Sequence, residues 1–166
     1  MSEFQIRQAL PREYAAIGEL TVGAYQGDGY LGADPDTGYA TVLRDVASRV
    51  EHGEVLAAVD ASGEVLGSLT IVRPGSRYAE VSQDGELEFR MLAVSAAARR
   101  RGVGEALTRA VLDRARALRL GRVVLCSLYL MTPAHRLYER LGFTRLEARD
   151  WEPEPGIRLL AYGIEV

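Results

Sequence analysis

The chain has 166 residues and a mass of 18.2 kDa, a size that suits one compact domain with its own core. Its residues are 48% hydrophobic and 26% charged, and this balance excludes a disordered chain. No run of about 18 apolar residues occurs, so we expect no membrane-spanning helix. The first residues lack the apolar stretch of a secretory signal peptide. We therefore expect a single domain over residues 1–166 that works in the cytoplasm.

The formal net charge is -3, and all 20 basic residues are arginine, because the sequence contains no lysine. The absence of lysine excludes a Walker A phosphate loop and a Schiff-base nucleophile, since both need a lysine amine. Two histidines and one cysteine are few ligands for a transition metal, so we expect no metal site. Cys126, as the one cysteine, has no partner for an internal disulfide.

The basic residues are concentrated in one segment. Residues 90–122 contain nine arginines and two acidic residues, whereas the rest of the chain contains 11 arginines and 21 acidic residues. A strongly basic segment therefore lies within an otherwise acidic protein. Such a segment is suited to a polyanionic ligand.

Alternating and 3.6-residue hydrophobic periods, with glycine and proline at the breaks, predict the secondary structure. In chain order we expect a strand over 4–9, a helix over 11–25, an irregular loop over 26–38, a helix over 40–52, strands over 54–60, 64–72 and 86–94, a helix over 104–118, a strand over 122–128, a helix over 133–141, and strands over 143–147 and 157–165. Gly63, in the short link between two strands, predicts a β-hairpin. This order predicts a mixed α/β domain around one central sheet.

The joint between the strand at 86–94 and the helix at 104–118 is the most informative part of the chain. Gly102 and Gly104 open the helix, and three consecutive arginines precede them. A helix N-terminus presents unpaired N–H groups to an anion, and glycine lets a ligand approach the backbone closely. Guanidinium groups add donors for phosphate. We therefore expect a pyrophosphate here, with a purely structural turn as the alternative.

Two other phosphate-binding functions fit these residues less well. A dinucleotide fingerprint needs a third glycine at position 107, where this chain has Leu107. An RNA-binding domain is disfavoured because no aromatic residue interrupts the arginines of residues 99–119. The arginines of the helix are better explained as a solvated helix face. We therefore expect no nucleic-acid partner.

Three segments together resemble a known family. They are Glu88-Phe-Arg-Met-Leu-Ala-Val94, Arg99-Arg-Arg-Gly-Val-Gly104-Glu-Ala-Leu107 and Ala134-His-Arg-Leu-Tyr138-Glu-Arg-Leu-Gly142-Phe143. In order and spacing they are similar to the GNAT superfamily of acyl-CoA-dependent N-acetyltransferases, and the second matches its Q/R-x-x-G-x-G/A loop for the coenzyme A pyrophosphate. The resemblance is close over 86–143 and extends to the first 80 residues only as an order of elements. It implies a GNAT-like fold with a mostly antiparallel central sheet flanked by helices.

The resemblance also implies a reaction and a role for individual residues. An acetyl group would pass directly from acetyl-CoA, the cosubstrate, to a primary amine of a small molecule or a peptide. The residues that would bind acetyl-CoA are Leu92, Ala93, Val94, Arg99, Arg100, Arg101, Gly102, Val103 and Gly104. Leu92 and Val94 would offer backbone groups to the pantetheine arm, and the N–H groups of residues 100–104 would hold the pyrophosphate. Tyr138 would stand near the thioester sulfur, and Glu88 where some members place a general base.

This chain departs from the family pattern at two positions. The family often has asparagine where this chain has Met131, and proline where it has Ala96. The first change puts one polar contact to the coenzyme in doubt, and the second changes only the stiffness of the loop.

The chemistry of acetyl transfer can be argued from the residues as well. Attack on a thioester needs a neutral amine, so a carboxylate must accept the proton of the amine, directly or through water. Glu88 is the first candidate and Glu86 the second, because alternate residues of a strand share a face. The phenol of Tyr138 can protonate the departing thiolate, and a backbone N–H near Val94 can stabilise the oxyanion. Without the family pattern, Glu88 would be an ordinary strand carboxylate and Tyr138 a core residue.

The acceptor amine is the least determined feature. The resemblance places its site at residues 26–39 and 149–162. Both segments are acidic, with Asp28, Asp34, Asp36, Asp150, Glu152 and Glu154, and carboxylates around an opening attract a cationic amine. Polyamine, amino sugar, amino acid and protein N-terminus all stay open as acceptors. The resemblance suggests a homodimer.

A non-catalytic module that binds or senses acyl-CoA on the same fold is the alternative function. Such a module would need neither a phenol at position 138 nor a carboxylate on the strand at 86–94. Both are present as Tyr138 and Glu88. We therefore favour an acyl-CoA-dependent N-acetyltransferase.

Overall fold

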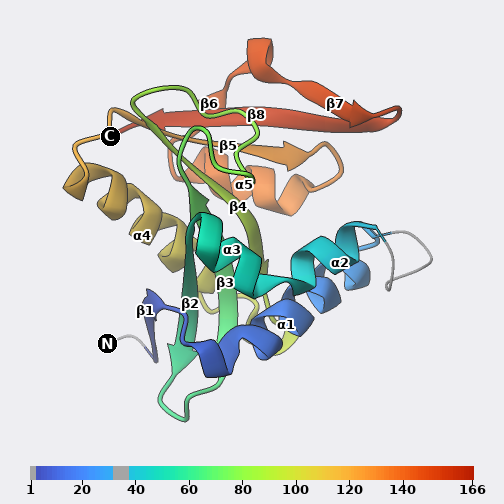
Figure 1. The fold of residues 1–166 in the computed structure, drawn as a ribbon, viewed down its shortest axis with the longest axis vertical. Coiled ribbons are helices and arrows are strands. Elements are labelled where there is room, and N and C mark those ends of the chain that lie inside the picture. The colour runs from blue at the N-terminus through green and yellow to red at the C-terminus, as the bar shows by residue number, and fades with distance from the viewer. Residues whose placement is uncertain (1–2, 32–37) are drawn as a thin grey trace.

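The computed structural model describes residues 3–31 and 38–166. These residues form one eight-stranded sheet in the order β1-β2-β3-β4-β5-β8-β6, with β7 paired to β8 (Figure 1). The strands are β1 (Phe4–Gln8), β2 (Glu54–Asp60), β3 (Val65–Val72), β4 (Glu86–Val94), β5 (Arg122–Leu128), β6 (Thr144–Arg145), β7 (Trp151–Glu154) and β8 (Ile157–Glu165). The helices are α1 (Tyr14–Gly27), α2 (Tyr39–Arg44), α3 (Val46–His52), α4 (Val103–Ala117) and α5 (Thr132–Arg140). The mixed, mostly antiparallel sheet predicted from the sequence is confirmed.

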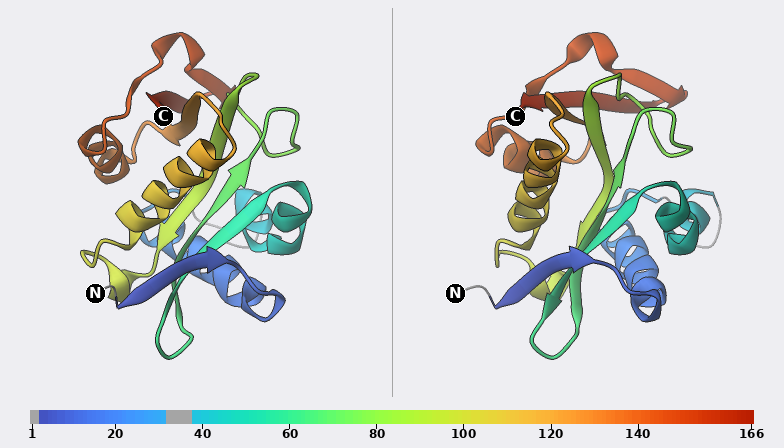
Figure 2. Two further views of the ribbon diagram at one scale, coloured as in Figure 1. Left: turned by 90° about the vertical axis from the view of Figure 1, so that its left-hand side faces the viewer. Right: turned by 60° about the vertical axis from the view of Figure 1, so that its left-hand side comes forward.

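Helices cover both faces of the sheet. Figure 2 shows α4 and α5 on one face and α1, α2 and α3 on the other. The largest buried cluster lies on the α4 side and includes Leu69, Phe89, Leu107 and Leu125, none of them more than 2% exposed. α4 buries its face because its apolar residues recur every three or four positions. Two smaller clusters lie on the side of α1 and α3.

β4 and β5 form the one parallel pair in the described sheet, and they pair over only part of their length. The register runs from Glu86 opposite Arg122 to Glu88 opposite Val124. β4 continues to Val94 and β5 to residue 128 without further pairing between the two strands. The facing backbone edges of both strands therefore stay available to a ligand.

A β-bulge in β4 lies beside this opening. The register with β3 shifts between Ser68 and Thr70, where Leu69 alone faces both Met91 and Leu92. Met91 has a φ of 60°, which is rare for a residue with a side chain. A bulge bends its strand and redirects the side chains at that point. It therefore changes the direction of β4 where the strand parts from β5.

One predicted helix is two helices in the structure. The prediction of a single helix over residues 40–52 is wrong, because Asp45 breaks the helix with φ and ψ of -83° and 68°. The Asp45 side chain accepts the N–H of Ser48 at 3.1 Å and so caps α3. The hydrophobic period continues across the break, so the sequence pattern alone does not indicate that the chain changes direction at Asp45.

The last strands also differ from the prediction. The strand expected over 143–147 spans only Thr144–Arg145, and the sequence analysis does not contain β7. Pro153 lies within β7 and argues against a strand, but β7 is at the edge of the sheet, where a missing N–H is tolerated. The expected loop over 26–38 is described only in part, since residues 32–37 lie outside the described ranges. No helix in the described ranges is long and apolar enough to cross a membrane.

Candidate active site

A pocket of about 430 Å³ lies at the opening between β4 and β5. β4 contributes residues 89–92 to its wall, and β5 contributes residues 125–128. α5 adds Ala134 and Tyr138, and the β7–β8 hairpin adds Glu154 and its neighbours. Among the predicted site residues, Leu92 and Tyr138 line this pocket, whereas Glu88 does not.

Tyr138 reaches the pocket from α5 and is 5% exposed. Its ring packs edge to face on Phe89, with ring centroids 5.9 Å apart, and also contacts Phe143 and Tyr162. Burial raises the pKa of Tyr138, helped by the nearby Cys126, so the phenol stays protonated at neutral pH. The hydroxyl hydrogen-bonds to no residue in the described part of the chain. It is therefore a buried donor available to a molecule in the pocket.

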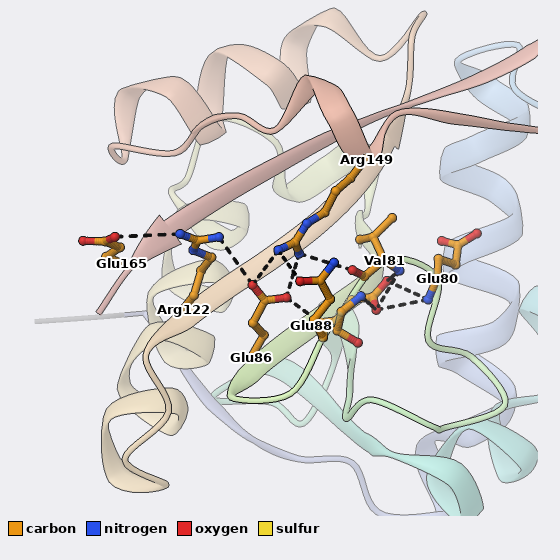
Figure 3. Close-up of polar contacts among 9 residues, drawn as sticks. Glu80, Val81, Glu86, Glu88, Arg122, Arg149 and Glu165 are labelled. Atoms are coloured by element: carbon orange, nitrogen blue, oxygen red, sulfur yellow. Dashed lines mark hydrogen bonds and ion pairs between the residues drawn. The ribbon is translucent and has the colours of Figure 1, made fainter.

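Glu88 is completely buried in β4. Its carboxylate accepts the backbone N–H groups of Glu80, Val81 and Ser82 at 3.0–3.4 Å (Figure 3). Three backbone donors thus occupy the side chain that the sequence analysis put first as a base. The contacts fix the loop between β3 and β4 against the start of β4.

Glu86, the second candidate, is held in an ion pair away from the pocket wall. Its two oxygens lie 2.7 and 3.0 Å from Nη1 and Nη2 of Arg149, and one of them accepts the N–H of Gln83 at 2.8 Å (Figure 3). Burial acts to raise the pKa of Glu86, but the hydrogen bonds from Arg149 and Gln83 and the charge of Arg122 outweigh it and lower the pKa. Glu86 therefore ties β4 to the segment before β7.

Glu80 is a carboxylate in the pocket wall that the sequence analysis did not identify. Its Oε1 atom lies 2.7 Å from Nε of Arg90 and accepts the Cys126 thiol at 3.1 Å. Burial raises the pKa of Glu80, although the charge of Arg90 and the thiol hydrogen bond partly oppose that rise. No motif marks position 80, which lies in a polar loop. The sequence therefore contains no signal that would single out this residue.

Glu80, Glu88 and Cys126 place potential metal-binding atoms within 4.8 Å of one another. Two features of this cluster suit a metal ion poorly. The Glu88 carboxylate already accepts three backbone N–H groups, and burial raises the pKa of the Cys126 thiol. Metal ions bind cysteine as the thiolate, so the cluster fits proton chemistry better than metal binding.

The turn before α4 has the geometry of an anion site. Arg100 and Gly102 have φ of 67° and 79°, and α4 begins at Val103. None of the N–H groups of residues 100–104 hydrogen-bonds within residues 3–31 and 38–166. A Cβ added at Gly102 would meet no atom within 4 Å, so the space beside it is open. Consecutive free N–H groups in such a turn form an anion-binding concavity, which fits a pyrophosphate.

The arginine side chains of this turn are paired in different ways. Arg99 lies 3.0 Å from Asp28, and Arg101 lies 2.9 Å from Glu3. The guanidinium of Arg100 has no carboxylate within 4 Å in the described part of the chain. Exposed ion pairs contribute little stability, so Arg99 and Arg101 can exchange these carboxylates for phosphate oxygens at small cost.

A wider depression of about 760 Å³ lies between α1, the β2–β3 hairpin and residues 95–99. Its wall contains Arg99, from the predicted coenzyme loop, and Asp28, from the expected acceptor segment, but neither Tyr138 nor Glu80 reaches it. Residues of both charge signs line it, among them Arg12 and Glu64. The smaller pocket is therefore the better candidate active site.

The acidic residues expected around the acceptor have different environments. Glu154 lines the pocket, whereas Asp28 is paired with Arg99. Asp150 is held by Arg145 and Arg158 and accepts the N–H of Ala161. Glu152 is exposed on β7. Asp34 and Asp36 lie outside the described residues.

Three tyrosines form a wall of the pocket near the end of α1. The ring of Tyr25 lies 6.2 Å from that of Tyr30 and 6.3 Å from that of Tyr39. The Tyr39 hydroxyl accepts a hydrogen bond from Nη2 of Arg90 at 3.0 Å. The pocket thus combines an aromatic wall with the Glu80–Arg90 ion pair.

Comparisons with known proteins agree with this fold. Residues 16–143 match the model of the acetyltransferase (GNAT) family, and the chain therefore belongs to the GNAT family of acetyltransferases. Enzymes of this family use acetyl-CoA as the acetyl donor. A search of the curated proteins found no match.

Many solved structures share the fold. A GNAT acetyltransferase of Staphylococcus aureus Mu50 aligns with a TM-score of 0.76 at 12% identity over 98% of each chain. The histone acetyltransferase HPA2 and related acetyltransferase of Corynebacterium glutamicum aligns with a TM-score of 0.72 at 26% identity, over 98% of this chain and 96% of that one. The protein yncA of Salmonella typhimurium, solved with acetyl-CoA, aligns with a TM-score of 0.66 at 21% identity, over 99% of this chain and 94% of that one.

Proposed function

We propose that the protein is an N-acetyltransferase that moves an acetyl group directly from acetyl-CoA to a primary amine of a small molecule or a peptide. The observation that carries the proposal is the Tyr138 hydroxyl, a buried donor in a pocket at the β4–β5 opening. The anion cradle at residues 100–104 follows the end of the same β4 strand. The pocket and the turn thus offer a proton donor for the coenzyme A thiolate and a set of N–H groups for its pyrophosphate.

The part of β4 that β5 leaves unpaired would bind the pantetheine arm. Leu92, Ala93 and Val94 lie there, beyond the last paired residue, Glu88. Their backbone groups on the β5 side can form strand-like hydrogen bonds with the amides of pantetheine. The N–H groups of residues 100–104 and the side chains of Arg99, Arg100 and Arg101 would bind the pyrophosphate.

Tyr138 would act as the acid in the reaction. Its phenol would give a proton to the coenzyme A thiolate as the carbon–sulfur bond breaks. A backbone N–H near Val94 would stabilise the oxyanion that precedes this step. The prediction that Glu88 or Glu86 is the base finds no support in the geometry, because neither carboxylate lines the pocket and both are held by other donors.

The acceptor site would lie among the tyrosines and the carboxylates of the pocket. Tyr25, Tyr30 and Tyr39 provide aromatic faces, which attract an alkylammonium group. Glu154, at the exposed β7–β8 hairpin, would draw a cationic amine toward the opening. We expect the activity in the cytoplasm, where acetyl-CoA is at hand, and a homodimer as the assembly.

Two measurements test the proposed function. Isothermal titration should show binding of acetyl-CoA and none of acetate, and a protein that does not bind acetyl-CoA at high micromolar concentration would refute the assignment. A thiol-release assay over spermidine, glucosamine, 2-phenylethylamine, amino acids and a peptide with a free N-terminus should show amine-dependent release of coenzyme A. Binding without any such release would favour the non-catalytic binding or sensing module.

A further inference from the structure

The group that deprotonates the amine is the missing part of the site. We propose that Glu80, in the loop between β3 and β4, is the general base of the reaction, and that Glu88 positions it. The inference rests on the proposed function. It goes beyond that function because neither the GNAT motifs nor the sequence pattern assigns a role to position 80.

The position of its carboxylate supports Glu80 as the base. Glu80 and Tyr138 line the same pocket of about 430 Å³, and Cys126 lies in the wall with them. Oε1 of Glu80 is held by Arg90 and Cys126 at 2.7 and 3.1 Å. Oε2 hydrogen-bonds to no residue in the described part of the chain. One oxygen therefore orients the carboxylate, and the other is free to accept a proton from an amine in the pocket.

The loop that carries Glu80 is held in a fixed geometry. The Glu88 carboxylate accepts the N–H groups of Glu80, Val81 and Ser82 (Figure 3). Glu88 itself is fully buried in β4, so it ties the loop to the sheet at the residue that carries the candidate base. A general base must be held in place to act. Glu88 is thus a positioning residue.

The electrostatic environment of Glu80 also suits a base. Burial and the negative charge of Glu88 favour its neutral form, whereas Arg90 and the thiol of Cys126 favour the ionised form. The balance raises the pKa of Glu80 above that of an exposed glutamate, which makes it a stronger proton acceptor. Arg90 is itself held by Tyr39 and by the carbonyl of Tyr78, both at 3.0 Å.

In the proposed reaction the amine loses one proton to Glu80 and a second to solvent. Oε2 of Glu80 takes one proton from the alkylammonium group, and the neutral nitrogen attacks the thioester carbonyl carbon to form the carbon–nitrogen bond. The carbon–sulfur bond then breaks, and the thiolate takes the proton of Tyr138. The nitrogen loses a second proton, which restores the Tyr138 phenol through solvent, while Glu80 releases its proton to bulk water. The products are the amide, coenzyme A and one proton.

The test compares Glu80→Gln with the wild type and with Glu51→Gln, a glutamate-to-glutamine change at an exposed residue of α3 outside the pocket. We expect Glu80→Gln to lower kcat/KM for 2-phenylethylamine, or for the best acceptor of the panel, by about 100-fold or more. The dissociation constant of acetyl-CoA should change less than twofold. The wild-type pH profile should fall on its acidic side as one group protonates, and this limb should vanish in Glu80→Gln. With aniline, an acceptor that is already neutral at pH 7, Glu80→Gln should lower kcat/KM much less.

A second variant separates the base from its support. Glu88→Gln should lower kcat and keep the acidic limb, because Glu80 still titrates although its loop is less well held. Wild-type kcat/KM in Glu80→Gln, or loss of the limb in Glu88→Gln alone, would overturn the assignment while leaving the acetyltransferase function intact. A wild-type protein that neither binds acetyl-CoA nor releases coenzyme A would overturn both.

Discussion

The backbone N–H of Glu80 lies 3.0 Å from each carboxylate oxygen of Glu88. The carboxylate that a strand pattern points to is therefore used to hold a second carboxylate, which lines the pocket. A buried carboxylate is normally satisfied by several hydrogen-bond donors. The donors to Glu88 are backbone N–H groups of one short loop, residues 80–82. The two glutamates therefore differ in their contacts, since Glu88 holds the loop and Glu80 forms part of the pocket wall.

Replacement of Tyr138 by phenylalanine tests the acid. The ring contacts with Phe89 and Phe143 are retained, so we expect a change in the free energy of unfolding of less than about 1 kcal/mol. Turnover should fall by about 100-fold, because general acid catalysis contributes on that scale. Steady-state kinetics and acetyl-CoA titration check this. Tyr14→Phe, at a partly buried tyrosine outside the pocket, is the control, and equal turnover in both variants would remove Tyr138 from the acid role.

Replacement of Gly102 by alanine tests the anion cradle. Gly102 and Gly63 both have positive φ, 79° and 88°, and a Cβ at either meets no atom within 4 Å. The backbone strain should therefore be similar, about 1 kcal/mol in each variant. Only Gly102→Ala places a methyl group beside the free N–H groups, so it alone should weaken acetyl-CoA binding, by about tenfold or more. Calorimetric titration of both variants with acetyl-CoA measures this difference. Equal affinities of the two variants for acetyl-CoA would count against an anion site at this turn.

Glu86 predicts a dependence of stability on pH. Its pKa in the folded state is lowered, so it stabilises the fold at pH values above the unfolded pKa of about 4.3, and that stabilisation is lost as the pH falls through the lower folded pKa. Glu86→Gln should therefore reduce the free energy of unfolding by about 1–2 kcal/mol at pH 7 and by progressively less below about pH 4. Urea unfolding at several pH values measures this. Glu165→Gln, at an exposed partner of Arg122, should show no such trend, and a pH-independent effect of Glu86→Gln would contradict the prediction.

The same substitution should have opposite effects at two glycines. A Cβ at Gly67 would lie 2.8 Å from Val103 and 2.9 Å from the Ala93 carbonyl, so Gly67→Ala should destabilise the fold by about 1–3 kcal/mol. A Cβ at Gly23, inside α1, would meet no atom within 4 Å. Gly23→Ala should therefore stabilise the helix by about 0.5–1 kcal/mol. Thermal and urea unfolding measure both changes in stability. A Gly67→Ala variant as stable as the wild type, or a destabilised Gly23→Ala variant, would contradict the prediction.

Several features follow from local sequence alone. The strands at 86–94 and 122–128 have the predicted bounds, because continuous or alternating apolar runs between breaks define a buried strand. The turn at Gly102 and the position of Tyr138 on a short helix are also local, since glycine and helix-start residues specify their own backbone. The family resemblance that rests on these segments is confirmed by the match over residues 16–143.

Other features depend on which parts of the chain meet in space. Asp45 ends a helix although the apolar period continues beyond it. β7 forms in spite of Pro153 because it pairs with β8 at the edge of the sheet. Glu80 belongs to a loop without a motif, and only the folding of that loop onto Glu88 brings its carboxylate into the pocket. By itself the sequence determined the central strands of the sheet, the turn before α4 and the family resemblance. Only the tertiary structure decided which carboxylate faces the pocket, because burial and hydrogen bonding of a side chain depend on residues far away along the chain.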